Sequence, residues 1–99
     1  MKINWSGSAI KDLEALRVFI ARENPDAAAE IALRIVNSVD ILDVFPAAGR
    51  SGRVTGTREL VVAGTPYLVP YRVQRDRIEV LRVIHSVAKM AGKVVRRIG

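Results

Sequence analysis

The chain has 99 residues, 49% of them hydrophobic, and this size suits one domain with a modest aliphatic core. Its lack of cysteine excludes a disulfide framework and a thiolate zinc site, and fits a reducing compartment. No run of about 18 apolar residues is present to span a bilayer, and the N-terminal residues lack the apolar stretch of a secretory signal. We therefore expect one soluble, cytoplasmic domain over residues 1–99 that does not engage a membrane.

The net charge of +6 is unevenly distributed along the chain. Residues 1–49 carry five Lys/Arg against seven Asp/Glu, a net of −2, whereas residues 50–99 carry eleven against three, a net of +8. This asymmetry favours an acidic partner for the second half, such as nucleic acid, a nucleoprotein or an acidic protein segment. A solvated basic face that aids solubility is the alternative.

Two amphipathic helices are predicted in the first half, after a short strand at residues 2–5. Ser6 or Ser8 can cap the first helix, and Asn24 can cap the second, with Pro25 in its first helical position. Apolar side chains recur at helical spacing in both: Ala9, Leu13, Leu16 and Ile20 in the first, and Ala28, Ile31, Ala32, Ile35, Val39 and Leu42 in the second. Only about two or three residues separate the helices, so an antiparallel hairpin is expected.

Three strands are predicted in the second half, at Thr57–Val62, Tyr67–Gln74 and Arg77–His85, after a glycine-rich loop over residues 47–56. Pro70 cannot donate a ladder hydrogen bond, so it predicts a bulge, an edge or a shorter middle strand. The resulting order, βααβββ, places a helical hairpin on one face of a small antiparallel sheet, which is an α+β fold.

A basic tail follows over residues 86–99. Its cations could share one face of a helix, and they are Lys89, Lys93, Arg96 and Arg97. The sequence leaves open whether this tail is ordered without a partner.

Few side chains are available for catalysis. One histidine cannot build a histidine-based metal site, and the loop glycines lack the Gly-Lys-Ser/Thr continuation of a phosphate loop. The helix carboxylates are interpreted as solvated charges, and they are Asp12, Glu14, Asp40 and Asp43. Metal-independent RNA cleavage needs an acid, a base and cations, for which the candidates are Arg58, Arg72, Arg82 and His85. On one continuous strand Arg82 and His85 would point to opposite faces, so this set is not expected to converge.

Several short elements, in this order, resemble the RelE/ParE superfamily of toxins from type II toxin–antitoxin systems. They cover residues 3–88 and are Asp12-Leu13, Asn24-Pro25, Leu42…Pro46…Gly49-Arg50, Arg58-Glu59-Leu60, Tyr67…Tyr71-Arg72-Val73 and Val80-Leu81-Arg82-Val83-Ile84-His85. The resemblance implies the same fold, a helical hairpin against an antiparallel sheet. It also implies one of two activities, because RelE-like members are ribosome-dependent mRNA endonucleases, whereas ParE-like members typically poison DNA gyrase.

Three departures from the nuclease pattern favour the ParE-like branch. Leu68 follows Tyr67, where nucleases usually carry an arginine. Glu59 and Val61 stand where RelE-like nucleases use lysines or glutamates. No aromatic residue follows Tyr71, so none near the C-terminus could stack on a splayed mRNA base.

The resemblance therefore implies a ParE-like toxin that binds gyrase, needs no cofactor and forms no metal site. Its target-binding surface is expected to combine the basic residues of the second half, which are Arg50, Arg53, Arg58, Arg72, Arg82, Lys89, Lys93, Arg96 and Arg97. The cognate antitoxin is expected to carry an acidic, amphipathic C-terminal segment and to make all contacts of the pair with operator DNA. The alternative is a RelE-like mRNA interferase that acts on the ribosome through Arg58, Arg72, Arg82 and His85.

Overall fold

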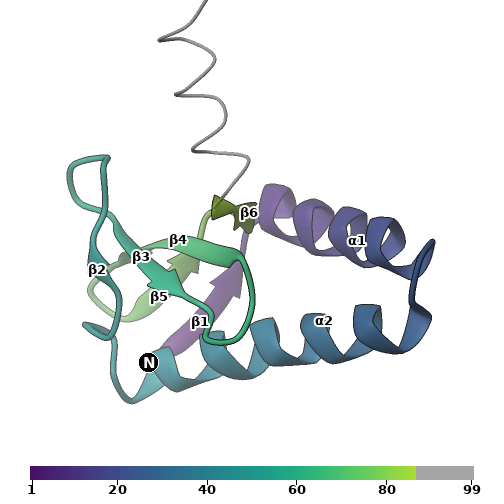
Figure 1. The fold of residues 1–99 in the computed structure, drawn as a ribbon. Helices are drawn as coiled ribbons and strands as arrows, with labels where there is room; N and C mark the ends of the chain where they lie inside the picture. The colour runs from purple at the N-terminus through teal and green to yellow at the C-terminus, as the bar shows by residue number, and fades with distance from the viewer. Residues whose placement is uncertain (87–99) are drawn as a thin grey trace, which may run out of the picture.

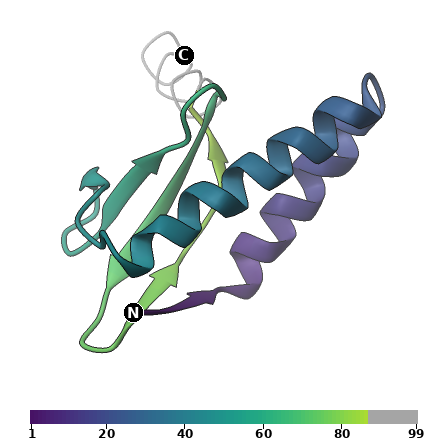
Figure 2. The same ribbon diagram turned by 90° about the horizontal axis from the view of Figure 1, so that it is seen from below.

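The computed structural model describes residues 1–86, in which a helical hairpin lies on one face of a six-stranded sheet (Figure 1, Figure 2). The helices are α1 (Gly7–Ala21), α2 (Pro25–Asp40) and the 3-10 helix η1 (Ile41–Asp43). The strands are β1 (Lys2–Trp5), β2 (Arg50–Ser51), β3 (Arg58–Val61), β4 (Tyr67–Val73), β5 (Arg77–Val80) and β6 (Ile84–His85). The predicted α+β fold is confirmed, and residues 87–99 of the predicted tail lie outside the described part of the chain.

Both helix starts are fixed by the side chains that the sequence indicated. The Ser6 hydroxyl accepts a hydrogen bond from the Ala9 amide at 3.0 Å, and the Asn24 side chain accepts one from the Ala27 amide at 3.1 Å. The α-helix α2 ends at Asp40, and the chain continues as the 3-10 helix η1 before it reaches Pro46. Within residues 1–86 neither helix is long and apolar enough to cross a membrane.

The sheet has the order β1-β5-β4-β3-β2, with β6 also paired to β4. All pairings are antiparallel except β1 with β5, which is parallel, and this exception was not predicted. Two parallel strands need a long connection between them. The helical hairpin and strands β2 to β4 lie between β1 and β5 along the chain and provide it. The glycine-rich loop also contributes a short strand, β2, where only a loop was expected.

The predicted continuous strand over residues 77–85 is wrong, because a bulge divides it into β5 and β6. Tyr71 of β4 pairs with Val80 of β5, whereas Tyr67 pairs with His85 of β6. Residues 81–83 therefore lie opposite only two residues of β4, one of them Pro70. Of the three options predicted for Pro70, the structure has a bulge, and it lies in the segment opposite this proline, where the Leu81 amide donates a hydrogen bond to the Pro70 carbonyl at 2.9 Å.

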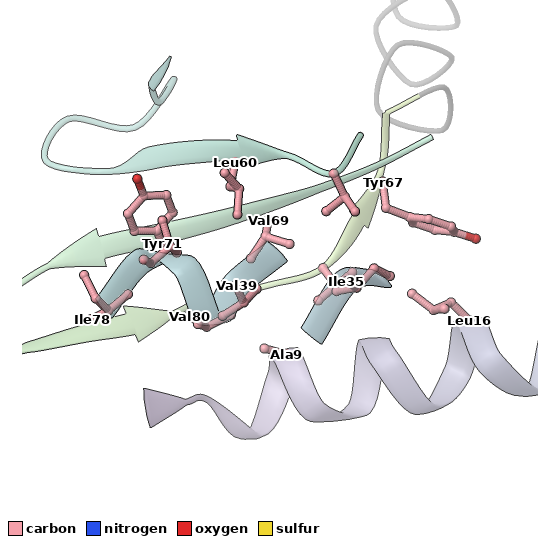
Figure 3. Close-up of a cluster of buried hydrophobic side chains, with 13 residues drawn as sticks. Ala9, Leu16, Ile35, Val39, Leu60, Tyr67, Val69, Tyr71, Ile78 and Val80 are labelled. Atoms are coloured by element: carbon pink, nitrogen blue, oxygen red, sulfur yellow. The ribbon is translucent and has the colours of Figure 1, made fainter. Parts of the chain in front are cut away.

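The core fills the space between the sheet and the hairpin, with Ile35 and Val39 of α2 facing Val69 and Val80 (Figure 3). At its end lies the fully buried ring of Tyr71. The Tyr71 hydroxyl donates a hydrogen bond to the Pro46 carbonyl at 2.7 Å and accepts one from the Gly49 amide at 2.8 Å. This ring therefore ties the chain between α2 and β2 to the middle of the sheet.

Candidate functional site

The arginines expected to form one basic surface are divided between the two faces of the sheet. Residues directly opposite in neighbouring strands share a face. Because Arg58 pairs with Tyr71, it lies on the face covered by the helices. Arg50 pairs with Glu59 on the other face, the open face, which no helix of residues 1–86 covers (Figure 1). Arg72 lies on the open face too, because it alternates with the core-facing Tyr71.

Arg50 and Arg53 border a carboxylate that the sequence did not identify as structural. Glu59 is only 5% exposed, and its Oε1 lies 3.6 Å from an Arg50 guanidinium nitrogen. Its Oε2 accepts a hydrogen bond from the Arg53 backbone amide at 3.3 Å. Burial of a carboxylate is costly unless it is paired in this way, so Glu59 holds the β2–β3 hairpin together. The Arg53 side chain extends from that hairpin into solvent.

Arg58 binds the backbone of the loop that precedes β2. Its guanidinium donates a hydrogen bond to the Gly49 carbonyl at 2.7 Å, while the Gly49 amide donates to Tyr71. Both backbone groups of Gly49 are thus held by side chains from β3 and β4. A Cβ atom at this glycine would lie 2.6 Å from a ring carbon of Tyr71, so the close approach requires glycine. Arg58 is therefore a positioning residue for the loop.

Arg82 is engaged with α1 in a bidentate ion pair. Its Nε lies 2.6 Å from Asp12 Oδ2, and its Nη2 lies 3.0 Å from Asp12 Oδ1. The Val83 amide also donates a hydrogen bond to Asp12 Oδ2 at 3.0 Å. This Asp12–Arg82 clasp fastens the bulged segment to α1.

The prediction that Asp12 is a solvated helix charge is wrong, because its side chain is only 18% exposed. Burial acts to raise the pKa of Asp12, but the hydrogen bonds from Arg82 and the Val83 amide, with the Arg82 charge, lower that pKa below its ordinary value of 3.8. The same hydrogen bond and charge raise the pKa of Arg82. The carboxylate is therefore ionised at neutral pH, and its role is structural.

Arg72 is an exposed cation on the open face. Its guanidinium forms no hydrogen bond or ion pair with another side chain of residues 1–86. The carboxylate opposite it, Glu79, is bound by Arg77 at 2.7 Å. Arg72 is thus available to an external anion. Arg58 and Arg82 are less available, because each is already bound within the protein.

The four residues considered for RNA cleavage do not meet at one point. His85 shares the helix-covered face with Tyr67, whose ring it contacts edge-on with centroids 5.2 Å apart. Arg58 lies on that face too, but it is displaced by four residues along β4, about 13 Å at strand spacing, and it lies on the other side of β4. Arg72 occupies the open face. Lys89, Lys93, Arg96 and Arg97 lie outside the described residues, and within residues 1–86 no group of three acidic or histidine side chains could hold a metal.

Comparison with known proteins gives a consistent relationship. A family model described as the ParE toxin of the type II toxin–antitoxin system, parDE, matches residues 3–89. The Y4kP protein of Sinorhizobium fredii is 45% identical over 85 residues, covering 86% of this chain and 88% of that protein. Toxin RelE2 of Caulobacter vibrioides is 35% identical over 85 residues, covering 86% and 94%. A solved chain from the chromosomal ParDE system of P. aeruginosa has a TM-score of 0.77 at 30% identity, covering 86% of this chain and 95% of that one.

Proposed function

Because this chain belongs to the ParE toxin family of type II toxin–antitoxin systems, and so to the RelE/ParE superfamily, we propose that it arrests growth by binding and poisoning DNA gyrase. The contact is made by the open face of the sheet, with Arg72 at its centre and Arg50 and Arg53 on the β2–β3 hairpin beside it. The mechanism is binding and trapping of the target, with no bond made or broken by this chain.

The observation that carries this proposal is the dispersal of the candidate nuclease residues. Arg58 is bound to the loop, Arg72 lies on the open face, and His85 lies against Tyr67 on the covered face, so these three side chains do not share one site. Acid–base catalysis requires the acid, the base and the cations within hydrogen-bonding reach of one scissile group. Binding an acidic target requires only exposed cations, and Arg72 is one.

Membership of the family also implies a cognate antitoxin. We expect it to supply an acidic, amphipathic segment that neutralises the toxin and a separate part that binds operator DNA. The excess of basic residues in the second half of this chain would speed the encounter with such a segment.

A second candidate is a ribosome-dependent mRNA interferase, because one relative at 35% identity carries the name Toxin RelE2. In that case Arg58, Arg72, Arg82 and His85 would act near the scissile phosphate, after a rearrangement that releases Arg82 from Asp12. The clasp would then have to open on the ribosome.

Two parallel assays separate the candidates. Purified toxin is added to a cell-free translation reaction, where the mRNA is examined for cleavage, and to gyrase with supercoiled DNA, where cleaved DNA–gyrase complexes are trapped and counted. We expect intact mRNA and accumulated cleavage complexes. Ribosome-dependent cuts in the mRNA, with gyrase unaffected, would replace the proposed function with the second candidate.

A further inference from the structure

A polar hollow of about 280 Å³ lies at the end of the sheet where β2 and β4 stop and β3 begins. Its walls are Ser51, Gly56, Thr57, Arg58 and Val73, and we call it the turn hollow. Ser51 pairs directly with Arg58, so both side chains lie on the same face of the sheet. Four of the wall residues offer a hydroxyl, a guanidinium or a backbone amide, and such groups bind the oxygens of anions. The lining therefore suits an anion rather than an apolar ligand.

The turn hollow contains donors that the protein itself does not use. The Arg58 guanidinium donates through Nη1 to the Gly49 carbonyl, while its Nε and Nη2 bond no other group of residues 1–86. The Ser51 hydroxyl is exposed and also has no partner in this part of the chain. A guanidinium carries five N–H groups, so the bond to Gly49 fixes its position without using its capacity. Arg58 is thus held in place to bind an oxyanion.

The turn over residues 52–57 forms the rest of the wall and is braced internally. The Thr57 amide donates to the Val54 carbonyl at 3.1 Å, and the Thr57 hydroxyl donates to the same carbonyl at 2.6 Å. Gly56 has a φ of 82°, the left-handed region that glycine adopts without strain. The amides of Thr55 and Gly56 donate to no group within residues 1–86. Successive free amides in a turn of this kind attract anions.

The charges around the turn hollow are mostly positive. Arg53 in the β2–β3 turn and Arg75 in the β4–β5 turn are exposed, and neither forms an ion pair within residues 1–86. The antiparallel register places both turns at the same end of the sheet. Of the nearby carboxylates, Glu59 is buried beside Arg50, and Asp76 directly follows Arg75. Several unpaired cations around one hollow match a ligand that carries several negative charges along its length.

From these features we propose that the turn hollow binds a backbone phosphate of duplex DNA, in the segment that gyrase holds; this inference rests on the proposed function. The phosphate lies against Arg58 and the Ser51 hydroxyl, with the cations of the two turns beside it. An acidic peptide fits less well, because Val73 is the single apolar wall residue against which its side chains could pack. A toxin that contacts gyrase and DNA together favours the state in which the two are joined, which is how a binder traps a cleavage complex.

The test places the same charge in the turn hollow and at a distant serine. Ser51→Glu puts a carboxylate beside Arg58, whereas Ser8→Glu puts one in the exposed first turn of α1, which follows β1 at the opposite edge of the sheet. The two variants have equal net charge, so general attraction to DNA affects both alike. The Kd of each toxin is measured for gyrase alone and for gyrase with DNA.

We expect DNA to lower the Kd of the wild type and of Ser8→Glu for gyrase by about tenfold, and to leave that of Ser51→Glu unchanged. Ser51→Ala, which removes only the hydroxyl, should lose about threefold of this gain. Circular dichroism and urea unfolding first establish that all variants fold. If Ser51→Glu does not fold, Ser51→Ala decides the question, and a full gain from DNA in that variant would count against the site.

An NMR titration of the free toxin identifies the ligand. A short DNA duplex should shift the amide signals of Ser51, Gly56 and Thr57, and it should do so at lower phosphate concentration than inorganic phosphate does. Equal effects of inorganic phosphate would make the turn hollow a site for small anions. Stronger effects of polyglutamate would assign it to an acidic protein segment. Either result would overturn the proposal for DNA.

The outcomes separate this site from the function on which it rests. If the wild type binds gyrase and traps cleavage complexes, but DNA does not tighten that binding or tightens it equally for Ser51→Glu, the turn hollow is overturned while the function stands. A wild-type toxin that neither binds gyrase nor traps cleavage complexes would overturn the proposed function itself.

Discussion

Tyr71→Phe removes one oxygen from the chain and two hydrogen bonds from its interior. The hydroxyl donates to Pro46 and accepts from Gly49, and the contact with Gly49 is buried. Without it the Gly49 amide loses its partner in a site that the phenylalanine ring still covers. An unsatisfied buried donor costs about 1–3 kcal/mol, and the lost bond to the Pro46 carbonyl adds about 1 kcal/mol. The expected loss of stability is therefore about 2–4 kcal/mol.

That loss is large for a domain of this size, whose total stability is of the order of 5–15 kcal/mol. The free energy of unfolding is measured by urea titration, with the fluorescence of Trp5, the single tryptophan, as the signal. Trp5 packs against the core and should report its opening. The midpoint should fall with little change in slope, and thermal unfolding should begin at least about 8 °C lower.

Tyr67→Phe is the matched control. Tyr67 is also a buried core residue on β4, but its hydroxyl forms no hydrogen bond within residues 1–86. The same deletion there should change stability by less than about 0.5 kcal/mol. In hydrogen exchange, the Gly49 amide should lose protection only in Tyr71→Phe. Equal losses in the two variants, or a loss below about 0.5 kcal/mol in Tyr71→Phe, would refute the reasoning from the buried hydrogen bonds.

Three further predictions follow from other contacts. Asp12→Asn should lower stability by about 1–2 kcal/mol at pH 7 in urea titrations, because its arginine partner is half exposed, while Glu14→Gln should be neutral. The pKa of Asp12 is lowered in the folded state, so the stabilisation by its carboxylate is complete above about pH 5 and is lost as the pH falls below 3.8 towards the folded pKa. A stability difference between the wild type and Asp12→Asn that stayed constant down to about pH 3 would contradict this. Arg72→Ala should reduce growth arrest without shifting the urea midpoint, and retained toxicity would count against the open face. Gly49→Ala should cost about 2 kcal/mol or more, since its Cβ would meet the ring at 2.6 Å, whereas Gly7→Ala at an open helical site should stabilise slightly.

The features predicted correctly from the sequence are those decided by neighbours along the chain. The caps at Ser6 and Asn24 each join groups three residues apart, so the residue types alone identify them. Pro70 lacks an amide hydrogen, so it predicted a bulge, an edge or a shorter strand, and the structure has a bulge opposite it.

The features that were missed depend on contacts between distant residues. Asp12 and Arg82 are 70 residues apart, and helical spacing says only that Asp12 flanks the buried stripe. The bulge shifts the alternation of β6 by one residue, so His85 joins Tyr67 on the covered face, whereas one continuous strand would place it on the same face as Glu79. The burial of Glu59 follows from its pairing with β2, a strand too short to show a pattern of its own.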